Sequence, residues 1–316
     1  MPSNRTSGRV LGLGCGQPHG SAEILLKAAL RAAAGEGAAV ELVRLDELRL
    51  PRRAAGDDAA AEQDDGWWLW DRLVECDGLI VSTPIISRTV AASLKLVIDR
   101  LLGPNADAAI IEGLLALRQE GREPAVPFRV DERVLKPRVA GFLAVGGSLT
   151  SQWKTLALPL LHSSTFSMHI AVVDQVQFEG AGTPRSIVLD EAAIDRAALL
   201  GCNVAGQLGV PFGEARYLGP PGLCPMCHLD VVVLRGAGVE CATCGARGRL
   251  GPDHQVTWTD LSVSVISMAE KRAHAAEIQD TARRHGELRA QIDQRARAFD
   301  ACDLVVRPGR AGAAPA

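Results

Sequence analysis

Five short apolar runs, separated by segments with helical periodicity, make up the first two thirds of the chain. The runs lie at residues 9–13, 40–44, 78–82, 139–145 and 169–173. The helical patterns lie at residues 21–34, 67–76, 91–102, 152–163 and 191–208. Continuous apolar strands that alternate with helices are typical of a parallel sheet covered on both faces. The pattern therefore predicts an α/β domain over residues 1–213, with a doubly wound five-stranded parallel sheet.

The alternation of predicted strands and helices is interrupted once, at residues 103–137. This segment carries a helical stretch and then a proline-rich tail, and it is too long for an ordinary connection. We interpret it as an insertion that serves as a lid or an oligomer arm, or as a tolerated surface insertion.

The character of the chain changes after residue 213. Residues 214–259 are rich in glycine and cysteine and predict a small separate domain, and residues 304–316 are expected to be disordered. Residues 260–303 have a helical pattern that predicts one long helix, about 58 Å over its apolar span. A globule of this mass is only about 45 Å across. We therefore expect this helix to cross to a neighbour in a homodimer or homotetramer.

Composition narrows the possible partners. The formal net charge of −3 argues against a broad nucleic-acid-binding surface, and no apolar run approaches the ~18 residues of a membrane span. Four of the eight cysteines are clustered and four are scattered, which is not a secreted disulfide framework. These features favour a cytoplasmic protein that acts on small molecules.

Three loops follow the first, third and fourth predicted strands, so they meet at the edge of the sheet where ligands bind. The first is a glycine-rich turn into a helix, an arrangement that holds phosphate. The second is fixed by a proline, and the third carries two glycines that allow close backbone approach to a flat ring. The candidate binding residues are Cys15, Gln17, His19, Ser21, Pro84, Ile85, Ile86, Ser87, Arg88, Thr89, Gly146, Gly147 and Ser148.

Several of these segments carry a family resemblance: the first loop with the helix start at residues 23–26, the stretch 77–84, and residues 93–100. They resemble flavodoxin-like NAD(P)H-dependent FMN reductases over about residues 9–210, and are similar to multimeric quinone reductases. The resemblance implies that the first loop holds the FMN phosphate and that the other two hold the isoalloxazine ring. It also implies NAD(P)H as the reductant and a quinone, a free flavin or a nitro compound as the acceptor.

The sequence departs from the family in the first and second loops. Cys15 and Gln17 stand where hydroxyls and an arginine are typical, Ala22 replaces a hydroxyl residue, and Ile86 replaces an aromatic one. The single phosphate cradle favours FMN over FAD. Arg88 is the best candidate for charge stabilisation, and no other catalytic residue is assigned.

A second kind of site is indicated by four cysteines, Cys224, Cys227, Cys241 and Cys244. Two pairs, each with a two-residue gap, bring four thiolates into a tetrahedron. The pattern resembles a zinc ribbon. A rubredoxin-like iron site is the alternative, but residues 224–250 contain no Phe, Tyr or Trp, and this favours zinc.

Two other functions remain open at this point: an electron-transfer flavoprotein with iron in the four-cysteine site, and a non-enzymatic interaction protein with a degenerate flavin pocket. Cys15, at a helix start, is a candidate for a lowered thiol pKa, although the sequence offers it no partner for a nucleophile's role. His274 is a candidate to reach a partner's pocket. We expect structural roles for Trp67, Trp68, Trp70, Cys76, Cys202, Cys302, His162 and His169. We expect His228 to lie at the surface or beside the metal ligands rather than to bind the metal.

Overall fold

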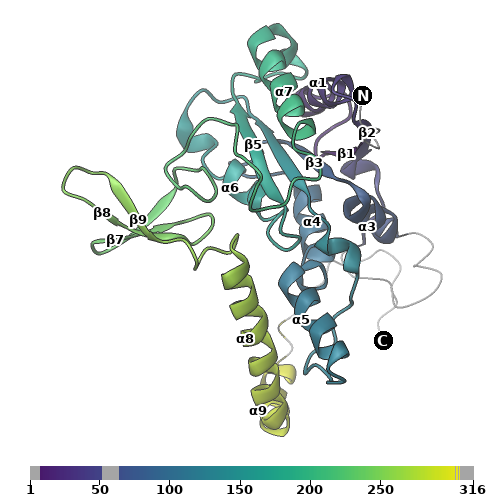
Figure 1. Cartoon of the computed structure of the whole chain (residues 1–316), viewed down its shortest axis with the longest axis vertical. Helices are drawn as coiled ribbons and strands as arrows, with labels where there is room; N and C mark the ends of the chain where they lie inside the picture. Colours follow the sequence, from purple (N-terminus) through teal and green to yellow (C-terminus); the bar gives the residue numbers. More distant parts are fainter. Residues whose placement is uncertain (1–7, 52–63, 303, 305, 307–316) are drawn as a thin grey trace.

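The computed structural model describes residues 8–51, 64–302, 304 and 306. Its main sheet has five parallel strands in the order β2-β1-β3-β4-β5, as the sequence predicts (Figure 1). The strands are β1 (Arg9–Gly14), β2 (Ala39–Arg44), β3 (Gly78–Pro84), β4 (Val139–Val145) and β5 (Ala171–Phe178). The fifth strand begins two residues later than predicted, because His169 has a positive φ of 51° and turns the chain before the strand starts. The strand also continues further than predicted, to Phe178.

Helices cover both faces of this sheet. One face packs against α1 (Ser21–Gly35) and α7 (Glu191–Ala205), which approach so closely that a Cβ at Gly201 would lie 2.0 Å from the Ala29 carbonyl oxygen. The other face packs against α3 (Gly66–Glu75), α4 (Ala92–Leu101), α5 (Ala108–Gln119) and α6 (Ala157–His162). Short 3₁₀ turns lie at Leu45–Glu47, Pro104–Ala106, Glu132–Leu135, Ser151–Trp153 and Ser186–Leu189.

The predicted helix at residues 152–163 is wrong in its first half. The structure has a 3₁₀ turn at Ser151–Trp153 and a separate helix from Ala157. Pro159 explains the break, because proline lacks an N–H group and is tolerated only in the first turn of a helix.

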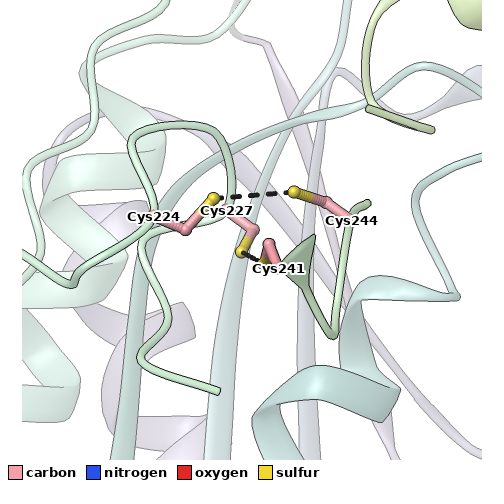
Figure 2. A group of neighbouring side chains, drawn as sticks. All are labelled: Cys224, Cys227, Cys241 and Cys244. Atoms are coloured by element: carbon pink, nitrogen blue, oxygen red, sulfur yellow. Dashed lines mark hydrogen bonds between the residues drawn. The ribbon is translucent and has the colours of Figure 1, made fainter. Parts of the chain in front are cut away.

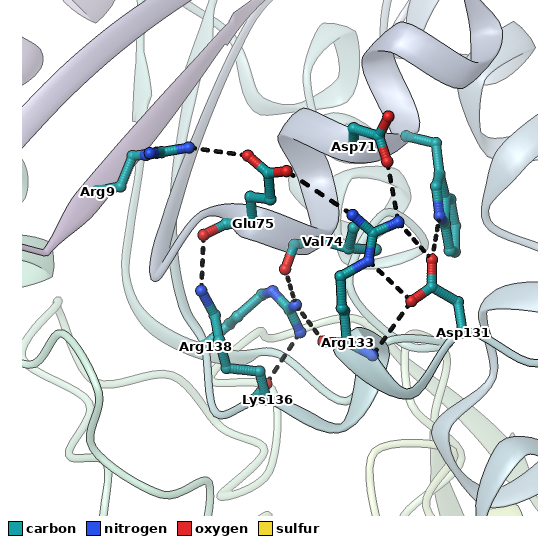
Figure 3. Close-up of polar contacts among 9 residues, drawn as sticks. Arg9, Asp71, Val74, Glu75, Asp131, Arg133, Lys136 and Arg138 are labelled. Atoms are coloured by element: carbon teal, nitrogen blue, oxygen red, sulfur yellow. Dashed lines mark hydrogen bonds and ion pairs between the residues drawn. The ribbon is translucent and has the colours of Figure 1, made fainter.

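The insertion at residues 103–137 is fastened to the body of the domain. Figure 3 shows Arg133 between Asp71 of α3 and Asp131, and the Trp70 ring nitrogen donates to Asp131 Oδ2 at 2.8 Å. Arg138, only 1% exposed, donates to the backbone carbonyl oxygens of Val74, Arg133 and Lys136 (Figure 3), and also to that of Val134. These contacts show that the insertion is held against the domain by ion pairs and buried hydrogen bonds.

The C-terminal third begins with a four-stranded antiparallel sheet that projects from the body (Figure 1). Its strands are β6 (Val232–Arg235), β7 (Gly238–Cys241), β8 (Arg247–Leu250) and β9 (Val256–Asp260). The predicted single helix over residues 260–303 is wrong in its extent. The structure has α8 (Met268–Glu287) and α9 (Arg289–Asp300), which are separated at Leu288.

The start of α8 is set by a cap, because the Ser267 hydroxyl accepts a hydrogen bond from the Glu270 N–H at 3.1 Å. The first half of α8 then packs on α5 of the same chain (Figure 1). Lys271 pairs with Asp107 at 3.4 Å, and Arg272 pairs with Glu112 at 3.1 Å. The insertion therefore serves as a platform for α8. Among the described residues, no helix is both long and apolar enough for a membrane span.

Candidate functional site

The three loops predicted from the sequence are adjacent in the structure. The Cys15 N–H donates to the Ser82 carbonyl oxygen at 2.9 Å, and the Ser93 hydroxyl donates to the Cys15 carbonyl oxygen at 3.3 Å. The Ile85 N–H donates to the Val145 carbonyl oxygen at 2.8 Å. The parallel register places the ends of β1, β3 and β4 side by side, and these bonds join the loops that leave them.

The first loop presents an uncapped helix start. Gly20 is the N-cap residue of α1 and provides no side-chain hydrogen bond. The N–H groups of Ser21, Ala22 and Glu23 lie in the first turn, where no intrahelical acceptor exists. Before them, a turn closed by the Gly20 N–H on the Gln17 carbonyl oxygen at 3.1 Å places His19 at a positive φ of 62°. This set of donors fits a single phosphate group at the positive end of α1.

A buried carboxylate lies in the same turn of α1. Glu23 is 3% exposed and accepts hydrogen bonds from Arg44 Nε at 2.8 Å and Arg44 Nη2 at 3.0 Å, and it also pairs with Lys27. Burial alone would raise the pKa of Glu23, but the bonds from Arg44 and Lys27 outweigh it and lower the pKa to about 2. The two cations offset the carboxylate, so it does not repel an anion on the first loop.

The second loop contains a strained turn without glycine. Ile86 and Thr89 exchange two backbone hydrogen bonds, both 2.9 Å long, around Ser87 and Arg88. These two residues have positive φ values of 48° and 73°, which is the pattern of a type I′ turn. Non-glycine residues in this region are held there at a cost, and such strain concentrates at ligand-binding sites. The Thr83 hydroxyl accepts a bond from the Ala91 N–H at 3.0 Å and holds the far end of the loop.

A hollow of about 330 Å³ separates the second and third loops. Gly147 belongs to its wall, and a Cβ there would lie 2.8 Å from the Gly182 Cα, so only glycine fits this approach to the loop after β5. Six of the predicted residues line the hollow, together with two that the sequence analysis missed: Ile85, Ser87, Arg88, Gly146, Gly147, Ser148, Trp153 and Lys154.

Trp153 supplies the aromatic side chain that the second loop lacks at Ile86, and it is 57% exposed. It follows the third loop by a few residues, which is the only signal in the sequence that could have identified it. Pro84, Ile86 and Thr89 build the turn beside the hollow, and Gln17, His19 and Ser21 lie in the first loop.

The structure does not support a reactive thiol at Cys15. The side chain is 1% exposed, and its Sγ lies 3.9 Å from the Leu13 carbonyl oxygen. Burial raises the pKa of this thiol, and the Asp46 charge raises it further. Cys15 can therefore face a ligand only through its backbone.

The four clustered cysteines come together as the sequence predicts. All four are buried, and their sulfur atoms lie within 4.8 Å of one another (Figure 2). The Sγ atoms of Cys224 and Cys244 are 3.6 Å apart, and those of Cys227 and Cys241 are 3.5 Å apart. A tetrahedral zinc with bonds of about 2.3 Å requires sulfur separations of about 3.8 Å, so the donor set fits such an ion. His228 is not part of this set and stacks on Tyr217, with ring centroids 3.7 Å apart.

Together, the strand order β2-β1-β3-β4-β5 and the loops at its carboxyl edge define a flavodoxin-like protein. The model of the NADPH-dependent FMN reductase family matches residues 9–181, more than half of the chain, and the protein belongs to this family. It is therefore a flavin-dependent oxidoreductase, and the non-enzymatic interpretation of the sequence is wrong.

Two relatives match more of the chain. The flavone synthase cfoJ of Aspergillus candidus is 38% identical over 259 residues, which cover 77% of this chain and 78% of that protein. A solved structure of a flavone reductase superposes with a TM-score of 0.78 at 25% identity, and the match covers 95% of this chain and all of the other. The second match extends well beyond the flavodoxin-like domain.

Proposed function

We propose that the protein is an NAD(P)H-dependent FMN oxidoreductase whose acceptor is a planar aryl enone of the flavone type. The observation that carries this proposal is the pair of relatives that share most of the chain and whose names both concern flavones. A flavone replaces the quinone, free flavin or nitro compound that the sequence suggested as acceptor. In the balanced reaction, NAD(P)H and one proton add a hydride and a proton across the conjugated carbon–carbon double bond, which gives a flavanone and NAD(P)⁺.

Bound FMN would supply the hydride relay between the nicotinamide and the acceptor. The uncapped first turn of α1, with the Ser21 hydroxyl, would bind the phosphate. The hollow between the second and third loops, with its glycine wall and Trp153, would hold flat rings. Because the matching family is described as NADPH-dependent, NADPH is the expected reductant.

Arg88 is the charged residue that we assign to the reacting end of this site. It lines the hollow in a strained turn, where its guanidinium group would stabilise negative charge on the reduced ring or on the enone oxygen. Lys154 lines the same hollow but is paired with Glu179, so its charge is already partly neutralised.

We assign a structural zinc ion to the four-cysteine site. Four thiolates complete a tetrahedron and leave no open position for substrate, which is typical of structural zinc sites. Iron would give the purified protein a red visible spectrum, and metal analysis separates the two cases.

The test is an anaerobic assay of the purified protein with NADH or NADPH and a panel of acceptors. Release of FMN on denaturation, together with conversion of a flavone to a flavanone in equal amount to the NAD(P)H consumed, is the expected result. Arg88→Gln should lower kcat by roughly 10- to 100-fold, as the loss of one stabilising charge does, whereas Arg118→Gln on the exposed side of α5 should not. Rapid quinone reduction without any flavone reduction would contradict the proposal.

A further inference from the structure

A second cavity, of about 350 Å³, lies between the flavodoxin-like domain and the four-cysteine ribbon. It opens beside the amino-terminal end of β5, where Ala171 and Val172 line it, whereas the flavin loops follow the carboxyl ends of the strands. The eight-residue strand separates the two edges by about 23 Å. The cavity is therefore distinct from the flavin hollow.

Its walls are aromatic and carry no formal charge. His169 stacks on Phe212 with ring centroids 3.8 Å apart, and His228 stacks on Tyr217 at 3.7 Å. The lining contains no Lys, Arg, Asp or Glu residue. Apolar and aromatic walls with a few polar groups, at the junction of two folding units, are typical of small-molecule sites. Such walls favour a neutral, flat ligand over a carboxylate or a phosphate.

The hydrogen bonds of His162 fix which of its two ring nitrogens carries the proton. The Gln175 amide nitrogen donates to the Cys227 carbonyl oxygen at 2.8 Å and to the His228 carbonyl oxygen at 3.3 Å. The Gln175 oxygen must then accept from His162, whose Nε2 lies 2.8 Å away. His162 Nε2 therefore carries the proton, and Nδ1 is left with a lone pair.

That lone pair has no partner in the described part of the chain. His162 is 1% exposed, lines the cavity, and has a buried Nδ1 atom without a hydrogen bond. Burial lowers the pKa of His162 to about 4, so the ring is neutral at pH 7. His169 lines the same cavity and has a second buried, unpartnered Nδ1. A buried acceptor without a donor is costly, and a ligand hydroxyl would satisfy it.

We propose that this cavity is a second binding site, for a neutral phenol whose hydroxyl donates to His162 Nδ1 while its ring lies among the stacked aromatic side chains. The site is separate from the flavin hollow and does not depend on the acceptor proposed for that hollow.

The test uses the full-length, FMN- and zinc-loaded protein labelled with ¹⁵N and two probes of nearly equal shape. These are 4-ethylphenol and 4-ethylanisole, which lacks the hydroxyl donor. We expect the unliganded protein to show His162 as the Nε2–H tautomer, with an unprotonated Nδ1 that receives no hydrogen bond. Saturation with 4-ethylphenol should shift the Nδ1 resonance, and 4-ethylanisole should bind roughly 3- to 10-fold more weakly, as expected for the loss of one hydrogen bond.

Two variants complete the design. His162→Phe keeps a ring next to Phe142 but removes the acceptor, and it should abolish the preference for the phenol. His285→Phe, on the exposed surface of α8, should keep that preference. Equal binding of the two probes, or a phenol that perturbs only the flavin signal, would overturn the proposal. So would a His162 Nδ1 resonance that is already hydrogen-bonded in the free protein and unchanged by the phenol; this measurement on the parent protein is decisive even if His162→Phe misfolds.

Discussion

The pairing of Glu23 with Arg44 beneath the first loop gives a sharp prediction about cofactor binding. Arg44→Met removes two hydrogen bonds from a carboxylate that is almost fully buried in the first turn of α1. Lys27 remains as a partner, so Glu23 keeps part of its charge compensation. The variant therefore leaves a poorly compensated negative charge where the proposed phosphate site lies.

The magnitude follows from the pKa of Glu23. Its fall from the ordinary 4.5 to about 2 corresponds to about 3 kcal/mol of stabilisation at neutral pH. Because the folded pKa lies below the unfolded one, this stabilisation is complete above about pH 4.5 and is lost as the pH falls towards 2. With Lys27 still in place, we expect Arg44→Met to cost about 2 kcal/mol of unfolding free energy at pH 7. It should weaken FMN binding roughly 5- to 30-fold, because the incompletely compensated Glu23 carboxylate would repel the phosphate at the start of α1.

A double-mutant cycle separates this effect from general damage. Unfolding in urea and quenching of FMN fluorescence should be measured for Arg44→Met, Glu23→Gln and the double variant. The double variant should recover most of the FMN affinity, because it removes the uncompensated charge. Arg122→Met breaks an exposed pair with Glu120 and should change stability by less than about 0.5 kcal/mol. The reasoning is refuted if Arg44→Met binds FMN as tightly as the parent, or if the double variant binds it no better than Arg44→Met does.

Three other perturbations test other parts of the molecule. Cys241→Ser should lose bound zinc, and limited proteolysis should then cut first in the chain beyond residue 213. Cys302→Ser, at an exposed thiol, is the control and should have neither effect. Unchanged protease resistance in Cys241→Ser would exclude a structural metal. Trp153→Ala should weaken ligand binding at the flavin hollow roughly 2- to 10-fold, the range of one aromatic contact. Titrations with flavin and with acceptor measure this affinity, and Trp68→Ala on α3 is the matched control. Removal of residues 289–316 should shift a homo-oligomer to monomer in light scattering, because α9 buries no residue in its own chain and exposes Phe299; a full-length monomer would end this expectation.

The sheet was predictable because the central strands β1, β3 and β4 consist mostly of buried apolar residues, and the parallel order follows from the helices between the strands. The boundaries that failed have local causes. Pro159 cuts the predicted helix at residues 152–163, and His169 turns the chain before β5. Ser267 and Glu270 have the spacing of a capping box, a sequence signal that marks the start of α8 and that the apolar pattern over residues 260–303 does not reveal.

Site residues were predictable where a single loop carries them, and the prediction missed those that separate elements bring together. The four cysteines and the loop glycines are close in sequence, so spacing alone indicated their use. Arg44 reaches Glu23 from the end of β2, 21 positions away, and no periodicity connects them. Trp153 faces the hollow only because the chain after β4 folds back towards the second loop.

The junction between the domain and the ribbon is the part that sequence could least reveal, and it bears on how the two sites relate. Gln175 on β5 bonds the carbonyl oxygen of Cys227, 52 positions away, and the same amide fixes His162 at the end of α6. The segment before α6 carries Trp153 and Lys154 of the flavin hollow. The short helix α6 therefore links the two sites: the segment before it lines the flavin hollow, and His162 at its end is connected through Gln175 to Cys227 of the four-cysteine site. The ribbon is held to the sheet by buried hydrogen bonds, so loss of its metal should disturb α6 before it disturbs β1–β3.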